Sequence, residues 1–184
     1  MEIISKSRLS QIRASAESRR AYGWLNEAVQ AKSRSPRTTE VTVFLSHKHE
    51  ELKELKDVIG LLEDTGVSVY IDWMDEGMPA STSGATAAKL KKRIVDCRKF
   101  VLLATEAAIA SEWCNWELGY GDAKKYIEHI AILPVKNDDR NFTGAEYLQI
   151  YPAVGEAPKW RFSSGYSVQF PSGKEVDLAD WLKS

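Results

Sequence analysis

The sequence lacks the features of a secreted scaffold and of a membrane protein. Its 184 residues include 2 cysteines, Cys97 and Cys114, in separate segments, so a disulfide framework is excluded and a reducing compartment suits the chain. The longest apolar runs, at 100–104 and 130–135, are far shorter than the about 20 residues of a membrane-spanning helix. The first residues contain no apolar signal-peptide segment. We therefore expect a cytoplasmic protein without membrane contact.

An excess of charge of one sign is also missing. The 25 Lys and Arg residues are balanced by 26 Asp and Glu residues, which gives a net charge of −1. Such a chain has no overall field that attracts nucleic acid or an anionic membrane surface. We therefore expect no nucleic-acid partner.

Basic residues are nevertheless concentrated at the start of the chain. Residues 1–37 contain eight Lys or Arg and three Glu, a net charge of +5, and their apolar residues recur at near-helical spacing. The segment ends in Ser33-Arg34-Ser35-Pro36, a linker signal. We interpret 1–37 as a basic helical leader and 38–184 as one domain. The leader has few large apolar residues, which favours packing on its own domain or self-assembly over contact with an acidic surface.

Strands and helices alternate along the rest of the chain. Apolar and β-branched segments predict strands at 41–45, 67–71, 100–104 and 130–135, and helical periodicity predicts helices at 52–62, 87–97 and 111–126. This alternation implies parallel pairing through right-handed crossovers, and hence an α/β fold with an open parallel sheet and helices on both faces. Beyond Pro134 the chain is rich in loops. We predict a C-terminal hairpin formed by 160–163, a turn at 164–165 and 166–170, followed by a short helix at 177–183.

Ligands of such sheets bind beyond the carboxyl ends of the strands, which directs attention to 46–51, 72–84 and 105–117. Familiar motifs are absent there, because the chain has no GxGxxG between a strand and a helix, no GxxxxGK[ST] and no GxSxG. His47 and His49 lie on one loop, and the only third histidine is distant in sequence. We therefore predict no metal site and interpret these histidines as solvated loop residues.

One pair of residues stands out in the helix predicted after the third strand. Trp113 and Glu117 are four residues apart, which places both on one helix face. One interpretation is a core tryptophan and a surface glutamate. The other is a ligand site, in which the tryptophan provides a planar wall and the carboxylate stabilises positive charge that develops on a sugar. Gly119 and Gly121 in the same helix indicate close packing against a neighbouring element.

A lone carboxylate suits one chemistry in particular. When an N-glycosidic bond to a pyridinium is cleaved, the leaving group departs as a neutral base and needs no acid. A single carboxylate can then hold the ribose hydroxyls and stabilise the oxocarbenium-like charge on the sugar.

Four segments together resemble the TIR (Toll/interleukin-1 receptor) domain family, of the stand-alone bacterial type, over about residues 40–135. They are Val43-Phe44-Leu45-Ser46-His47, Val69-Tyr70-Ile71-Asp72-Trp73, 100–104 and 111–119. The resemblance implies a flavodoxin-like fold and, for catalytic members, cleavage of NAD to nicotinamide and ADP-ribose or a cyclic ADP-ribose isomer. It makes Glu117, in a WxxxE motif with Trp113, the catalytic residue. NAD is then a substrate, and the resemblance implies no cofactor.

The same resemblance assigns further substrate-binding residues. Ser46, His47 and Lys48 border the nucleotide in this interpretation. Lys48 either meets the pyrophosphate or lies in solvent. Asp72 either caps its loop or lies at the edge of the site. Trp73 is either half buried in the protein or stacked on the substrate.

Two functional hypotheses follow from the resemblance. In the first, the chain is an NAD glycohydrolase or ADP-ribosyl cyclase, similar to the TIR enzymes of Thoeris-type antiphage defence, which make an immune messenger for a separate effector protein. In the second, it is a non-catalytic adaptor that acts through TIR–TIR contacts, with Glu117 a surface charge. Both hypotheses include self-association. In the enzyme hypothesis, the loop 72–84 of a neighbouring copy completes the site.

Overall fold

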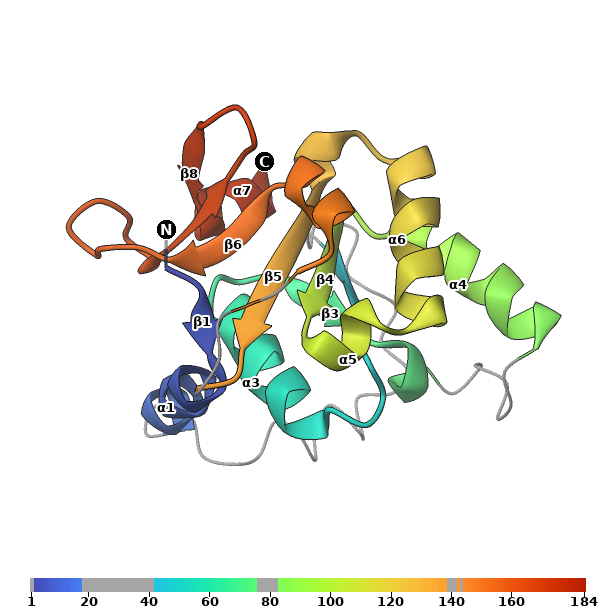
Figure 1. Cartoon of the computed structure of the whole chain (residues 1–184), viewed down its shortest axis with the longest axis horizontal. Helices are drawn as coiled ribbons and strands as arrows, with labels where there is room; N and C mark the ends of the chain where they lie inside the picture. Colours follow the sequence, from blue (N-terminus) through green and yellow to red (C-terminus); the bar gives the residue numbers. More distant parts are fainter. Residues whose placement is uncertain (1, 18–41, 76–82, 139–141, 143) are drawn as a thin grey trace.

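The computed structural model describes residues 2–17, 42–75, 83–138, 142 and 144–184. The fold is an eight-stranded, mostly parallel sheet with helices on both faces (Figure 1). The strands are β1 (Ile4–Ser5), β2 (Thr42–Ser46), β3 (Ser68–Tyr70), β4 (Lys99–Ala104), β5 (Ile130–Lys136), β6 (Ala153–Glu156), β7 (Tyr166–Gln169) and β8 (Glu175–Asp177). The α-helices are α1 (Lys6–Glu17), α3 (Leu52–Glu63), α4 (Gly84–Asp96), α5 (Glu106–Ile109), α6 (Glu112–Lys124) and α7 (Leu178–Lys183). Short 3-10 helices are η1 (Asp72–Met74), η2 (Ile127–His129) and η3 (Glu146–Ile150).

The parallel part of the sheet has the flavodoxin-like strand order. β3, β2, β4, β5 and β6 lie side by side in that order, and neighbours pair in parallel. β2 therefore lies between β3 and β4, at the point where the order of the strands reverses. The four strands predicted from 41 to 135 are present, which confirms the α/β interpretation. The carboxyl ends of β2, β3 and β4 meet at one end of the sheet, so the segments that follow them are brought together.

The predicted C-terminal hairpin is wrong in its first arm. Residues 160–163 belong to a turn, in which the backbone amides of Arg161 and Phe162 donate to the carbonyl of Pro158. β7 instead pairs antiparallel with β6 on one side and with β8 on the other. The aromatic residues of this turn resemble strand residues in sequence. However, Trp160 is 86% exposed, so no core draws the segment into the sheet.

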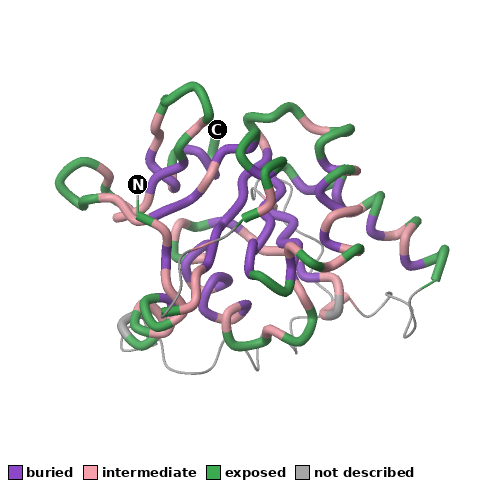
Figure 2. Tube along the Cα trace, in the orientation of Figure 1, coloured by how far each residue is buried: buried purple, intermediate pink, exposed green. Residues whose placement is uncertain are grey.

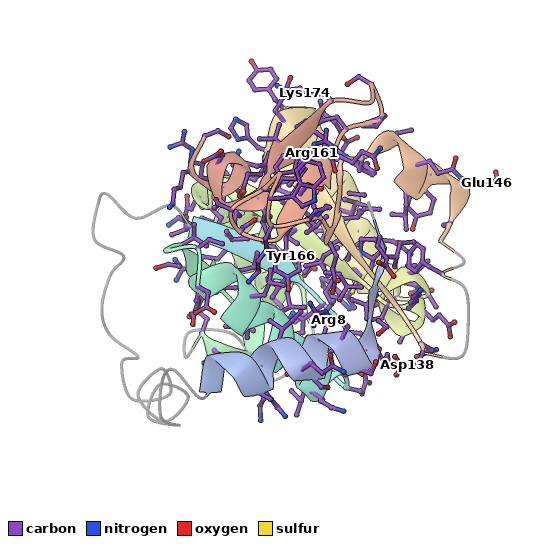
Figure 3. The ribbon with its side chains drawn as sticks, turned by 90° about the vertical axis from the view of Figure 1, so that its left-hand side faces the viewer. Arg8, Asp138, Glu146, Arg161, Tyr166 and Lys174 are labelled. Atoms are coloured by element: carbon purple, nitrogen blue, oxygen red, sulfur yellow. The ribbon has the colours of Figure 1, made fainter. Side chains whose placement is uncertain are left out.

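The start of the chain contributes a strand as well as the predicted helix. β1 pairs in parallel with β5, and α1 packs along α3. Ile4 and Leu9 are buried in the same core as β2 and α3. Arg8 of α1 forms an ion pair with Glu156 of β6, 2.6 Å from Nε to Oε1. Figure 3 views this side, with α1 lying beneath the C-terminal strands. The rest of the leader, 18–37, lies outside the described residues.

Each face of the sheet has its own hydrophobic core, and the central strands between them are buried (Figure 2). On one face, α1, α3 and α7 pack on strand residues such as Leu45 and Leu133. On the other face, α4 and α6 pack on strand residues such as Phe44 and Phe100. Adjacent residues such as Phe44 and Leu45 enter opposite cores because side chains alternate along a strand. The central strands are therefore buried on both sides.

Helix α6 lies close to the sheet at Gly121. A β-carbon at Gly121 would lie 3.2 Å from Cδ2 of Phe100 on β4, whereas a β-carbon at Gly119 would meet nothing within 4 Å. The prediction of close packing is therefore confirmed for Gly121 and wrong for Gly119, which is exposed.

Neither cysteine forms a disulfide among the described residues. Cys97 and Cys114 are buried and free, and burial raises the pKa of the Cys97 thiol to about 11, which makes it a packing residue. Within the described ranges, no helix is both long enough and apolar enough to cross a membrane.

Gly121→Val is expected to lower the free energy of unfolding by about 1–3 kcal/mol, because the added carbons meet the Phe100 ring and push α6 away from β4. Urea denaturation measures this change. Gly119→Val is the matched control in the same helix, where the new β-carbon has open space. We expect it to change stability by less than about 0.5 kcal/mol. Equal losses in the two variants would contradict the close contact at Gly121.

Candidate active site

The carboxyl group of Glu117 is buried beside the end of β2. Helix α6 begins after Ser111, whose hydroxyl accepts a hydrogen bond from the backbone amide of Cys114, as expected for a helix cap. Glu117 lies on the inward face of this helix and is 6% exposed. The buried hydroxyl of Ser46 donates a hydrogen bond to its Oε2, at 2.6 Å. The interpretation of Glu117 as a surface charge is therefore wrong.

Burial decides the protonation state of Glu117. The loss of water around the carboxyl group raises its pKa to about 8, although the hydrogen bond from Ser46 acts in the opposite direction. The negative charge of Asp72 raises the pKa further, and His49 lowers it. The carboxyl group is therefore mostly protonated at pH 7 when the site is empty. A positive charge placed against it would favour the ionised form.

Asp72 joins the two histidines that follow β2. Its Oδ2 lies 3.2 Å from Nε2 of His49, and its Oδ1 lies 3.9 Å from Nε2 of His47. The two imidazole rings are 5.4 Å apart between centroids. His47 is 5% exposed, and burial lowers its pKa, whereas the hydrogen bond to Asp72 raises the pKa of the exposed His49. The interpretation as a solvated loop residue is therefore wrong for His47 and holds for His49.

Three other predicted residues lie at different depths. Lys48 is partly exposed, with its Nζ 3.3 Å from Oε2 of Glu50. Trp113, one turn before Glu117 on α6, is half-buried, and its ring meets Trp116 edge-on with the centroids 5.2 Å apart. The side chain of Trp73 lies outside the described residues, although its backbone belongs to η1. A role of these residues in substrate binding stays a prediction.

A charged cluster that the sequence analysis missed fixes the chain just after β3. Asp75 accepts hydrogen bonds from the hydroxyl of Tyr70 and Nζ of Lys89, both at 2.9 Å, and from the guanidinium of Arg93 at 3.0 and 3.2 Å. The guanidinium also lies over the Tyr70 ring, 5.1 Å from its centroid. The spacing of Lys89 and Arg93 on α4 indicates two cations on one helix face, but it does not identify their acidic partner. We call these four residues the Asp75 cluster.

A second missed contact joins the loops after β2 and β4. Glu51 accepts a hydrogen bond from the hydroxyl of Thr105, which also caps α5. Lys6 of α1 lies 3.0 Å from a carboxylate oxygen of Glu54 and 3.8 Å from one of Glu51. The first helix of the chain is therefore connected to the loop that carries the two histidines.

This arrangement can stabilise a positive charge that appears at the end of β2. Glu117 offers a carboxylate in surroundings from which water is largely removed, and Ser46 orients one of its oxygens. A charge held in such fixed surroundings acts strongly on a cationic transition state, because little has to reorganise. The pKa of the neighbouring His49 is raised toward neutral pH, so this ring can exchange protons there. The site therefore suits a reaction in which a sugar carbon becomes cationic.

Comparisons with known proteins identify the family of the chain and two relatives. A family model described as "TIR domain" matches residues 43–156. The chain is 34% identical over 118 residues to the probable 3' cyclic ADP-D-ribose synthase ThsB' of Bacillus cereus (strain MSX-D12), an alignment that covers 62% of this chain and 60% of that protein. It is 30% identical over 81 residues to the putative cyclic ADP-D-ribose synthase TIR2 of Cytobacillus dafuensis, which covers 42% of this chain and 21% of that protein. The chain therefore spans less than two thirds of the length of either relative.

Glu117→Gln is expected to stabilise the protein at pH 8 by roughly 4 kcal/mol, a rise in Tm on the order of 10 °C. The carboxyl group ionises near pH 4.5 in the unfolded chain and near pH 8 in the folded protein. Between these values the folded state holds the extra proton, so the stability of the wild type falls as the pH rises. Glutamine has a similar size and no charge to bury. Calorimetry from about pH 5 to pH 8 should show the gap between the two proteins widening, and parallel curves would exclude a raised pKa.

Asp75→Asn is expected to lower the free energy of unfolding by about 1–3 kcal/mol, because Lys89 and Arg93 lose the carboxylate on which they converge. Thermal unfolding measures the loss. The matched control is Asp96→Asn, which removes an exposed ion pair with Lys92 on α4, the helix that also carries Lys89 and Arg93. It should lower the free energy of unfolding by less than about 0.5 kcal/mol. A similar small effect in both variants would mean that the Asp75 cluster adds little to stability.

Proposed function

The chain belongs to the TIR domain family, and from that premise we propose that it is an enzyme that cleaves the bond between nicotinamide and ribose in NAD. Its products are nicotinamide and a cyclic ADP-ribose isomer, with ADP-ribose formed when water replaces the internal nucleophile. The observation that carries the proposal is the buried carboxyl group of Glu117, held by Ser46 where the strand order reverses. The names of the two relatives, both cyclic ADP-D-ribose synthases, support the class of product.

The proposed reaction needs a carboxylate and no acid. The nicotinamide nitrogen of NAD is positively charged, and it takes the electron pair of the breaking carbon–nitrogen bond, so nicotinamide leaves as a neutral molecule. Positive charge then develops on the ribose, where Glu117 stabilises it. The cationic nicotinamide ring also favours the ionised form of Glu117 when NAD binds. The substrate therefore promotes the charge state that its cleavage requires.

Other residues bind the substrate in this proposal. Ser46 orients the catalytic carboxylate, and Asp72 holds the histidines at the edge of the site. Trp113 provides a flat wall for a planar ring. Lys48 exchanges its contact with Glu50 for the pyrophosphate of NAD. NAD enters as a substrate, and the proposal includes no resident cofactor or metal.

The proposal extends to two partners. The first is a second copy of the chain, whose loop 72–84 completes the site, as expected for self-association in this family. Residues 76–82 of that loop lie outside the described residues. The second is a separate effector protein in antiphage defence, for which the cyclic product is the messenger. A small diffusible product allows the enzyme to signal without contact between the two proteins.

Glu117→Gln is expected to lower nicotinamide release from NAD by at least about 100-fold, because the charge on the ribose loses its carboxylate. In the wild type, kcat/KM should rise with pH up to an apparent pKa of about 8, since the free enzyme must ionise Glu117. The assay measures nicotinamide and product mass at high protein concentration with a crowding agent. A cyclic product is lighter than ADP-ribose by one water.

Glu112→Gln is the control for this experiment, because Glu112 is exposed on the first turn of the same helix. It should retain wild-type turnover. Nicotinamide release that is equally fast in Glu117→Gln would refute the proposed function.

A further inference from the structure

The imidazole of His47 is anchored on one side and open on the other. Its Nδ1 lies 3.0 Å from the carbonyl oxygen of Leu45, and its Nε2 has no hydrogen-bond partner among the residues that the structure describes. The residue is 5% exposed, so bulk water does not satisfy this nitrogen. A buried polar atom without a partner is costly in a folded protein. This nitrogen is therefore a place where a ligand atom can be received.

The hydrogen bond to Leu45 determines what Nε2 offers. A carbonyl oxygen only accepts hydrogen bonds, so Nδ1 must carry a proton. Burial lowers the pKa of His47, which keeps the ring neutral at pH 7. A neutral ring protonated on Nδ1 has its lone pair on Nε2. His47 consequently presents a base and not a donor.

We propose that His47 is the proton acceptor for the hydroxyl group that attacks the ribose carbon, an inference that rests on the proposed function. Nε2 of His47 and Oδ1 of Asp72 are 3.9 Å apart, so one oxygen atom can lie within about 2.8 Å of both. A water molecule in that position donates one proton to each of these acceptors, whereas a hydroxyl of the substrate donates its single proton to Nε2 of His47. His47 directly follows Ser46, the partner of Glu117, so the base lies next to the residue that orients the catalytic carboxylate.

The step balances without any further reactant. The attacking oxygen forms a bond to the ribose carbon, and the electron pair of the breaking bond leaves with nicotinamide. The proton of the hydroxyl moves to Nε2 of His47. The resulting imidazolium lies 3.9 Å from Oδ1 of Asp72, whose negative charge stabilises it. His47 then passes the proton to solvent and returns to the neutral form.

The other titratable groups around His47 suit this role less well. Nε2 of His49 is already within 3.2 Å of Oδ2 of Asp72, and the side chain is 60% exposed. Asp72 is the partner that stabilises the charged ring. Glu117 has to keep its negative charge for the ribose while the nucleophile attacks. His47 is left as the buried group with a free lone pair.

The test compares reactions that need a proton acceptor with one that does not. Hydrolysis, and cyclisation through a hydroxyl group of the substrate, both remove a proton from an oxygen nucleophile. Exchange of nicotinamide for 3-acetylpyridine removes none, because the pyridine nitrogen attacks with a lone pair and carries no proton. The ribose becomes cationic in all three reactions, so all three depend on Glu117.

His47→Asn keeps an N–H group that can donate to the carbonyl of Leu45 but has no basic nitrogen. We expect it to form the cyclic product and ADP-ribose about 100-fold more slowly than the wild type, with pyridine exchange at the wild-type rate. Glu117→Gln should lose all three reactions. The matched control is His129→Asn, the same substitution in η2 at the opposite end of the sheet, which should leave all three unchanged.

The outcomes separate this inference from the proposed function. An equal loss of exchange and cyclisation in a His47→Asn protein that melts like the wild type, or no loss of either, would overturn the role of His47 alone. Wild type that releases no nicotinamide under the same conditions would overturn the proposed function and the inference with it. If the His47→Asn protein does not fold, nitrogen-15 NMR of the wild type tests the inference instead. A neutral His47 protonated on Nδ1 at pH 7 is expected, and a proton on Nε2 would refute the inference.

Discussion

The close approach of α6 to the sheet is the constraint on which the site depends. Because position 121 has no side chain, the ring of Phe100 on β4 lies against the helix backbone. Glu117, one turn earlier on the same inward face of the helix, is therefore buried beside Ser46. A helix held further out would leave this carboxyl group in water, with an ordinary pKa. The packing of a glycine on a phenylalanine ring thus controls the electrostatics of a residue one helical turn away.

The acidic residues around the site have separate tasks. Asp75 is surrounded by two cations and a tyrosine hydroxyl, and Glu51 is held by Thr105 and approached by Lys6, so their charges are used to position loops. The described hydrogen bond of the Glu117 carboxyl group is with the neutral hydroxyl of Ser46. A nearby fixed cation would ionise Glu117 permanently and weaken its response to a cationic ligand. The loops are therefore stabilised by ion pairs, while the described contacts of the central carboxyl group include no cation.

Sequence patterns were sufficient for the parallel core and for the position of Glu117 near the ends of its strands, while the role of Glu117 stays a prediction. Buried parallel strands are continuous apolar runs, and the residues that follow β2, β3 and β4 are brought together by topology. The Asp75 cluster was not predictable, because tertiary packing determines which acidic residue lies beside Lys89 and Arg93. The burial of His47 and the raised pKa of Glu117 also depend on the tertiary packing around these two side chains. The first arm of the hairpin was misplaced, since aromatic residues at 160 and 162 resemble a strand where the chain in fact turns.

Strand β1 is short, but its place in the sheet has a consequence for how copies of the chain can associate. β5 pairs with β6 at Ile132, and further along, at Val135 and Lys136, its partner is β1. Glu2 also bridges to Glu156 at the end of β6. The first residues thus cover main-chain groups that would otherwise be open to any extended segment. Another copy of the chain carries the same strand, which can make the same backbone pairings. Strand exchange between copies would leave every backbone pairing in the sheet intact.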